Sequence, residues 1–173
     1  MGVSLTPHPD FPCQSVSRIE VEIARTGAAL TLTYIVSGRI RDLALPSVAA
    51  PARADGLWRH TCFEAFVRPE PGEGYTEYNL APSTQWAAYG FTGYRESMAP
   101  ADATPRIEVH ASDSALTLIA LLEPPPGPCR VALSAVIEET GDAKSYWALA
   151  HPPGRPDFHH AAGFILTLPM VIP

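Results

Sequence analysis

The sequence predicts an all-β protein built as an antiparallel sandwich or barrel. Apolar and polar residues alternate with period two in many short stretches, which turns one face of each strand toward a core. The 19 prolines, including the run at 124–126, would break helices and central strands alike, so they mark connections between strands. No stretch has a convincing helical period. Many short strands separated by Pro and Gly turns are typical of sandwiches and barrels.

The alternation defines the strands in order along the chain. Residues 19–23 alternate Ile, Val and Ile with two glutamates, and residues 30–34 alternate Leu, Leu and Tyr with two threonines. An Ala- and Pro-rich loop is expected at 43–56. Further strands are expected at 61–67, 75–80, 86–91, 107–111, 115–122, 131–137, 145–150 and 164–168.

Length and charge restrict the classes of protein. A chain of 173 residues is expected to form one domain, 1–173, with its core at about 16–169. The net charge of -6 and the single lysine argue against a nucleic-acid partner. Three scattered cysteines indicate neither a disulfide framework nor a zinc site. No secretion signal or bilayer-crossing stretch is seen, so we expect a soluble, cytoplasmic protein with no membrane partner.

The block 57–95 contains nine of the fifteen aromatic residues and the only asparagine, Asn79. If 61–67 and 75–80 form a hairpin, the core face carries Phe63 and Tyr78, while the other face carries Glu64, Glu77 and Asn79 along with His60 and Cys62. The symmetric register sets Glu64 opposite Glu77, a like-charge pair that needs compensation from an arginine, a cation or a ligand. The next strand is expected to add Trp86, Ala88 and Gly90 to this face and to turn Ala87, Tyr89 and Phe91 inward.

Two interpretations of this face stay open. An indole beside small residues, with carboxylates and an amide, suits a sugar ring, whose C–H face stacks and whose hydroxyls form hydrogen bonds. Alternatively, the face packs beneath a loop and Arg59 or Arg95 pairs with the glutamates.

The second notable segment, 145–160, combines aromatic, Pro and His residues. His151, Asp157 and His159 are candidate metal ligands by residue type. The alternative is a rigid loop in which Asp157 caps backbone amides, and the absence of a metal-binding spacing favours it.

Familiar catalytic and nucleotide-binding motifs are absent from the sequence, so we assign no catalytic residues. Two carboxylates on neighbouring strands could still form the acid and nucleophile of a glycoside hydrolase. Glu64 and Glu77 therefore remain an enzymatic alternative.

At these residues the chain resembles the bacterial DOMON-like domains related to family-nine carbohydrate-binding modules. The resemblance rests on Leu57-Trp58, Thr61-Cys62-Phe63-Glu64-Ala65-Phe66, Tyr78-Asn79-Leu80-Ala81-Pro82, Trp86-Ala87-Ala88-Tyr89, Tyr146-Trp147-Ala148-Leu149-Ala150-His151 and Pro156-Asp157-Phe158-His159, and it extends from about Ile19 to Leu168. It implies an immunoglobulin-like sandwich that binds a sugar or haem.

The resemblance also implies site residues. Trp58 and Glu64 would bind the sugar, with Trp147 or Phe158 as the opposite aromatic plane. For haem, Met98 would be one axial ligand and His151 or His159 the other.

The leading hypothesis is a noncatalytic module for a small-molecule or oligosaccharide ligand, without a cofactor. Haem or metal binding, hydrolysis and docking of a protein partner are the alternatives. The candidate ligand-binding residues are Trp58, Arg59, His60, Glu64, Glu77, Asn79, Trp86 and Trp147.

Overall fold

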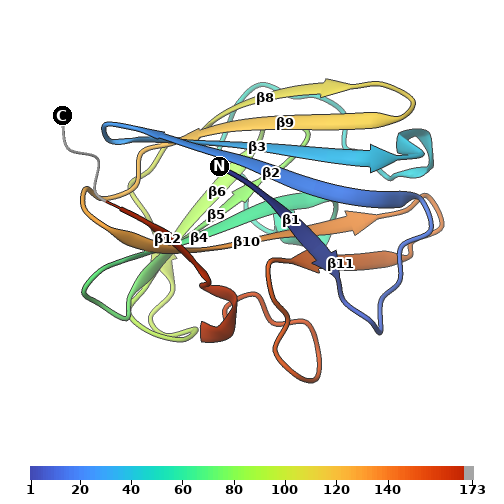
Figure 1. Cartoon of the computed structure of the whole chain (residues 1–173). Helices are drawn as coiled ribbons and strands as arrows, with labels where there is room; N and C mark the ends of the chain where they lie inside the picture. Colours follow the sequence, from blue (N-terminus) through green and yellow to red (C-terminus); the bar gives the residue numbers. More distant parts are fainter. Residues whose placement is uncertain (170–173) are drawn as a thin grey trace.

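The computed structural model describes residues 1–169 and contains one antiparallel sheet that curls over on itself (Figure 1). Its order is β7-β6-β5-β4-β10-β11-β1-β2-β3-β9-β8, and β12 pairs with β10. The strands are β1 (Gly2–Pro7), β2 (Val16–Thr26), β3 (Ala29–Gly38), β4 (Cys62–Pro69), β5 (Tyr75–Leu80), β6 (Trp86–Phe91), β7 (Ala99–Pro100), β8 (Arg106–Ala111), β9 (Ala115–Leu122), β10 (Cys129–Glu138), β11 (Lys144–Ala148) and β12 (Leu166–Leu168). Three short 3-10 helices accompany them: η1 (Ile40–Asp42), η2 (Leu57–Arg59) and η3 (Ala161–Gly163).

The predicted antiparallel all-β class is confirmed, and each expected strand coincides with or overlaps an observed one. The sequence did not predict β1 and β7. β1 pairs with β2 through residues 2–5 and with β11 through Thr6 and Pro7, so it joins the two halves into one continuous sheet. The immunoglobulin-like sandwich of two separate sheets therefore stays a prediction. The last four residues of the expected domain, 170–173, lie outside the described residues.

The main core lies between the two halves of the curled sheet. The buried side chains of β2, β3 and β9 face those of β4, β5 and β10. Tyr34 of β3 shows the contact directly: its ring centroid lies 5.0 Å from that of Phe63, and its hydroxyl donates to the backbone oxygen of Glu64 at 2.8 Å. This hydrogen bond satisfies a buried hydroxyl and ties β3 to β4.

A second apolar cluster lies on the opposite face of β4, β5, β6 and β10. It contains Phe66, Tyr75, Ala87, Tyr89, Phe91, Ala132 and Phe164, with Leu57 and Phe158 packed against it. Antiparallel sheets commonly expose one face to water. Here the segment around 158–164 contributes Phe158 and Phe164 to that face, so β4 and β5 are largely buried on both sides.

Gly38 ends β3 at a point where two backbone segments meet closely. Its φ is +152°, and a Cβ placed there would lie 2.1 Å from the backbone oxygen of Ser15. The pairing of β2 with β3 changes register here, between Val16 and Arg18. Only glycine fits this position without displacing the neighbouring backbone.

Among residues 1–169, no helix is both long and apolar enough to span a bilayer.

Candidate functional site

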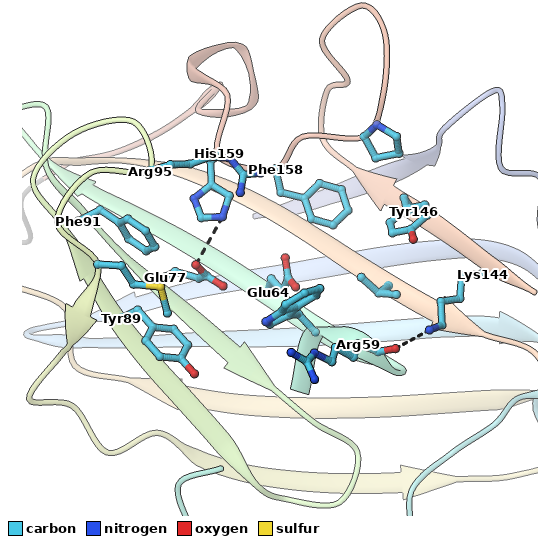
Figure 2. A pocket seen from close by; sticks show the side chains of 14 residues that line it. Arg59, Glu64, Glu77, Tyr89, Phe91, Arg95, Lys144, Tyr146, Phe158 and His159 are labelled. Atoms are coloured by element: carbon cyan, nitrogen blue, oxygen red, sulfur yellow. Dashed lines mark hydrogen bonds and ion pairs between the residues drawn. The ribbon is translucent and has the colours of Figure 1, made fainter. Parts of the chain in front are cut away.

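A pocket of about 690 Å³ lies on the outer face of the half-sheet formed by β4, β5, β6, β10 and β11. Figure 2 shows the carboxylates of Glu64 and Glu77 rising from the sheet beneath Phe158 and His159. The aromatic lining residues are Trp58, Tyr89, Phe91, Tyr146 and Phe158, and the basic ones are Arg59, Arg95 and Lys144. The pocket therefore combines two acids, a mostly aromatic wall and three cationic side chains.

The register between β4 and β5 positions the two acids. Glu64 pairs with Asn79 and Phe66 pairs with Glu77, so the predicted symmetric register, with Glu64 opposite Glu77, is wrong by two residues. β4 extends to Pro69, where it still pairs with β10, and β5 begins at Tyr75. A shift of two residues preserves the faces, so Glu64, Glu77 and Asn79 do share one face, with the acids as diagonal neighbours.

Each carboxylate accepts one side-chain hydrogen bond from the described residues. The Ser134 hydroxyl donates to Glu64 Oε2 at 3.2 Å, and the Asn79 amide donates to Glu77 Oε1 at 2.7 Å. Within residues 1–169 no hydrogen bond reaches Glu64 Oε1 or Glu77 Oε2, although His159 Nε2 lies 3.6 Å from the latter. Glu64 is 3 % exposed and Glu77 is 6 % exposed. Each acid is thus largely buried and presents to the pocket one oxygen without a hydrogen bond from the described residues.

Burial changes the ionisation of this cluster. Desolvation and then the charge of Glu77 raise the pKa of Glu64 well above its usual value, against the Ser134 hydrogen bond and Arg95. Desolvation also raises the pKa of Glu77, although Asn79 and Arg95 oppose the shift. Burial lowers the pKa of His159 to about 4, so its imidazole is neutral at pH 7 and does not balance the Glu77 charge.

The cationic side chains around the pocket interact with other groups. Arg95 Nη2 lies 2.8 Å from Asp157 Oδ1, and the Tyr94 hydroxyl donates to Asp157 Oδ2 at 2.6 Å. The Arg59 guanidinium lies 5.4 Å from the centre of the Trp58 ring. Across the described part of the chain, no arginine or lysine forms an ion pair with Glu64 or Glu77. The alternative in which Arg59 or Arg95 pairs with the glutamates is therefore wrong, although a loop does cover part of the face.

Lys144 is also held by the protein. Its ammonium donates to the backbone oxygen of Arg59 at 2.6 Å and lies 3.5 Å from Glu138 Oε1. His60 contacts the same carboxylate through Nδ1, 2.7 Å from Glu138 Oε2, and it is not a lining residue. Of the predicted ligand-binding residues around η2, Trp58 and Arg59 line the pocket, and Trp58 is 50 % exposed.

The predicted position of Trp86 is wrong. Ala87, and not Trp86, pairs with Asn79, so Ala87, Tyr89 and Phe91 share the acidic face while Trp86 packs against the main core. The cause is the three-residue turn 82–84, in which Thr84 adopts a φ of 71° and Ala81 N–H donates to Gln85 O at 3.0 Å. Pairing of 81 with 85 brings 79 opposite 87, which reverses the faces of the strand.

Trp147 likewise lies in the main core, where its indole donates to Ser145 Oγ at 2.9 Å. It is 3 % exposed and does not line the pocket. Its neighbour Tyr146 faces the pocket instead, because successive residues of β11 point to opposite faces. Phe158, the other predicted aromatic plane, is a lining residue.

The candidate metal ligands do not converge. His151 Nε2 lies 2.8 Å from Thr6 O, Asp157 interacts with Tyr94 and Arg95, and His159 Nδ1 lies 2.7 Å from the Tyr75 hydroxyl. Within residues 1–169 no group of three or more His, Cys, Asp or Glu side chains could hold a metal ion.

The haem ligands implied by the resemblance are only partly brought together. Met98 and His159 line the same pocket, whereas His151 does not. Both nitrogens of His159 face protein groups, Nδ1 toward Tyr75 and Nε2 toward Glu77. The imidazole as placed does not offer a free nitrogen to iron, so these residues do not fit a haem without rearrangement.

Several lining residues were missed by the sequence analysis, among them Tyr89, Phe91, Lys144 and Tyr146. Tyr89 and Phe91 face the pocket because 81 pairs with 85 across the turn, which the residue types of 82–84 do not reveal, whereas strict alternation in β11 would have found Tyr146. The approach of Phe158 and His159 depends on contacts between distant segments, such as Arg95 with Asp157.

Comparisons with known proteins support the fold. No family model and no curated protein sequence matches the chain. Among solved structures, the chain is similar to a candidate carbohydrate-binding protein from Bacteroides uniformis, with a TM-score of 0.72 and 17 % sequence identity. The match covers 95 % of this chain and 84 % of the other. Nearly the whole chain therefore shares its fold with that protein.

Proposed function

We propose that the pocket binds a carbohydrate and that the chain is a noncatalytic binding module. The observation that carries this proposal is the arrangement of Glu64 and Glu77, two buried acids with available oxygens inside an aromatic pocket of about 690 Å³. Volumes of this order are typical of small-molecule sites.

The chemistry of a sugar matches both parts of the lining. Its hydroxyls would donate to Glu64 Oε1 and Glu77 Oε2, which are strong acceptors when ionised. Its C–H faces would stack on aromatic rings of the lining, such as those of Trp58 and Phe158. Asn79 lies beneath the surface and orients Glu77 through its amide.

The fold comparison supports this proposal because the similar Bacteroides protein is described as a candidate carbohydrate-binding protein. The resemblance to DOMON-like domains and family-nine modules points the same way, and an immunoglobulin-like sandwich is the arrangement that it implies. Membership of that family forms part of the proposal.

The proposal is tested by calorimetry with a panel of neutral, acidic and amino monosaccharides and their short oligomers. We expect saturable binding that is weakened by Glu64→Gln and by Glu77→Gln. Glu108→Gln, an exposed acid on β8 in the other half of the sheet, is the matched control and should bind as wild type does. No binding across the panel, or binding indifferent to both pocket substitutions, would refute the proposal.

A second candidate is glycoside hydrolysis, favoured by one observation. Both carboxyls have raised pKa values, as a general acid requires at neutral pH. Hydrolysis of chromogenic glycosides, lost in both Glu64→Gln and Glu77→Gln, would establish it. Stable bound sugars with no release of chromophore would favour the binding module.

A further inference from the structure

The two acids of the pocket lack a positive partner in contact with them. Glu64 is bonded by a neutral hydroxyl and Glu77 by a neutral amide, while His159, the nearest basic group to Glu77, has a pKa of about 4. Buried carboxylates are normally paired with a cation or hold a proton. Within residues 1–169 the protein supplies no arginine or lysine as an ion-pair partner for either acid.

The surrounding ionisable groups do not alter this balance. Arg95 favours ionisation of both acids from a distance but is paired with Asp157, and Lys144 is paired with Glu138. Arg59 stacks on Trp58. The other titratable groups near the acids are Tyr34, Cys62, Tyr75 and Tyr89, all neutral at pH 7 because burial raises their pKa values above already high ordinary ones.

The aromatic wall is also suited to a cation. The negative faces of aromatic rings attract ammonium groups, most strongly where water is excluded. Four aromatic residues from separate segments line the same pocket as the acids: Trp58, Tyr89, Tyr146 and Phe158. An ammonium has three donors, which suffice for the available oxygens of Glu64 and Glu77.

We propose that the sugar bound here carries a free amine, whose ammonium lies between Glu64 and Glu77 and donates hydrogen bonds to both carboxylates. This inference rests on the proposed function and specifies its ligand class. An N-acetylated or purely hydroxylated sugar lacks the charge that these acids need. The basic side chains at the pocket oppose an ammonium less than free ones would, because Arg95 and Lys144 are paired with acids and Arg59 lies over an indole.

The test compares sugars that differ only in the substituent at carbon 2. Amine, acetamide and hydroxyl forms in the gluco, galacto and manno series are titrated against the protein by calorimetry and by amide chemical-shift changes. We expect the amine of at least one series to bind roughly ten- to hundredfold more tightly than its acetamide and hydroxyl counterparts, as expected for a charged hydrogen bond. Glu64→Gln and Glu77→Gln should remove this preference, and Glu108→Gln should keep it.

The wild-type protein gives a second readout that does not depend on the folding of a variant. The affinity for the amine should rise from mildly acidic to neutral pH, because protons then compete less for the two acids, whereas the affinity for the hydroxyl sugar should change less. Equal or tighter binding of the uncharged sugars would overturn the amine inference and leave the carbohydrate proposal standing. If none of the nine sugars and no member of the wider panel binds, both the amine inference and the carbohydrate proposal are overturned.

Discussion

Replacement of Glu64 by glutamine should stabilise the protein at neutral pH. The amide has nearly the same shape and its oxygen can accept the hydrogen bond from Ser134, which the carboxylate now accepts at 3.2 Å. The substitution removes an ionisable group that is 3 % exposed, has no cationic partner and is repelled by Glu77. A side chain that serves only the fold should not improve stability when it is replaced, whereas a binding residue can.

The ionisation equilibrium limits the size of the effect. A glutamate ionises in the unfolded chain with a pKa of about 4.3, so keeping it protonated in the fold at pH 7 costs at most about 3.7 kcal/mol. The Ser134 hydrogen bond and the field of Arg95 reduce this cost. We expect a gain of about 2 kcal/mol, which for a chain of this length corresponds to a rise in Tm of about 4–8 °C.

The gain should depend on pH in a defined direction. Folding raises the pKa of Glu64, so the folded chain binds this proton more tightly than the unfolded chain does. The cost is fully present above the folded pKa and disappears as the pH falls below the unfolded value of about 4.3. The difference in Tm between Glu64→Gln and wild type should therefore shrink as the pH is lowered from 7 toward about 4.

Thermal unfolding followed by circular dichroism across this pH range measures the effect. Glu108→Gln replaces an exposed acid on β8 and should change the free energy of unfolding by less than about 0.5 kcal/mol. If Glu64→Gln lowers Tm at neutral pH while the control does not, the carboxylate stabilises the fold and the reasoning is refuted.

Three further predictions address single features. Trp58→Ala should weaken sugar binding about tenfold with little change in Tm, since the indole is 50 % exposed; unchanged affinity would exclude it from the site. Gly38→Ala should lower the free energy of unfolding by more than about 2 kcal/mol, because the added Cβ would lie 2.1 Å from Ser15 O. Urea titrations measure this loss, and a smaller one would show that the backbone can shift at this position. A pH titration of the His159 imidazole followed by nitrogen-detected NMR should give a pKa of about 4. A pKa close to that of a free histidine would contradict the burial of this side chain.

The strands of the core could be predicted because their pattern is local. In β3, for example, burial alternates along the strand, and the sequence shows it as Leu30, Leu32 and Tyr34 separated by threonines. β1 lacks such a pattern, since Leu5 is its only fully buried residue and its role is to pair with both β2 and β11. Backbone pairing of this kind leaves little trace in side-chain composition.

Along the sheet, the pocket residues that strand alternation placed correctly lie on β4 and β5. The face that carries Glu64, Glu77 and Asn79 follows from alternation, and it survived a register error of two residues. The predicted position of Trp86 was wrong, because a shift of one residue in a turn exchanges the two faces of the strand that follows. The left-handed conformation of Thr84 in that turn is not evident from its residue type.

The covered face of β4 and β5 connects the fold to the proposed chemistry. Phe158 and Phe164 pack on a face that an antiparallel sheet often leaves to water, and the two acids on this face are only 3 % and 6 % exposed. A dry environment makes unpaired carboxylates costly for the protein, and it strengthens each hydrogen bond that a ligand donates to them. The same burial that should make Glu64→Gln more stable should therefore make it a poorer binder, so stability and affinity are expected to change in opposite directions at this one residue.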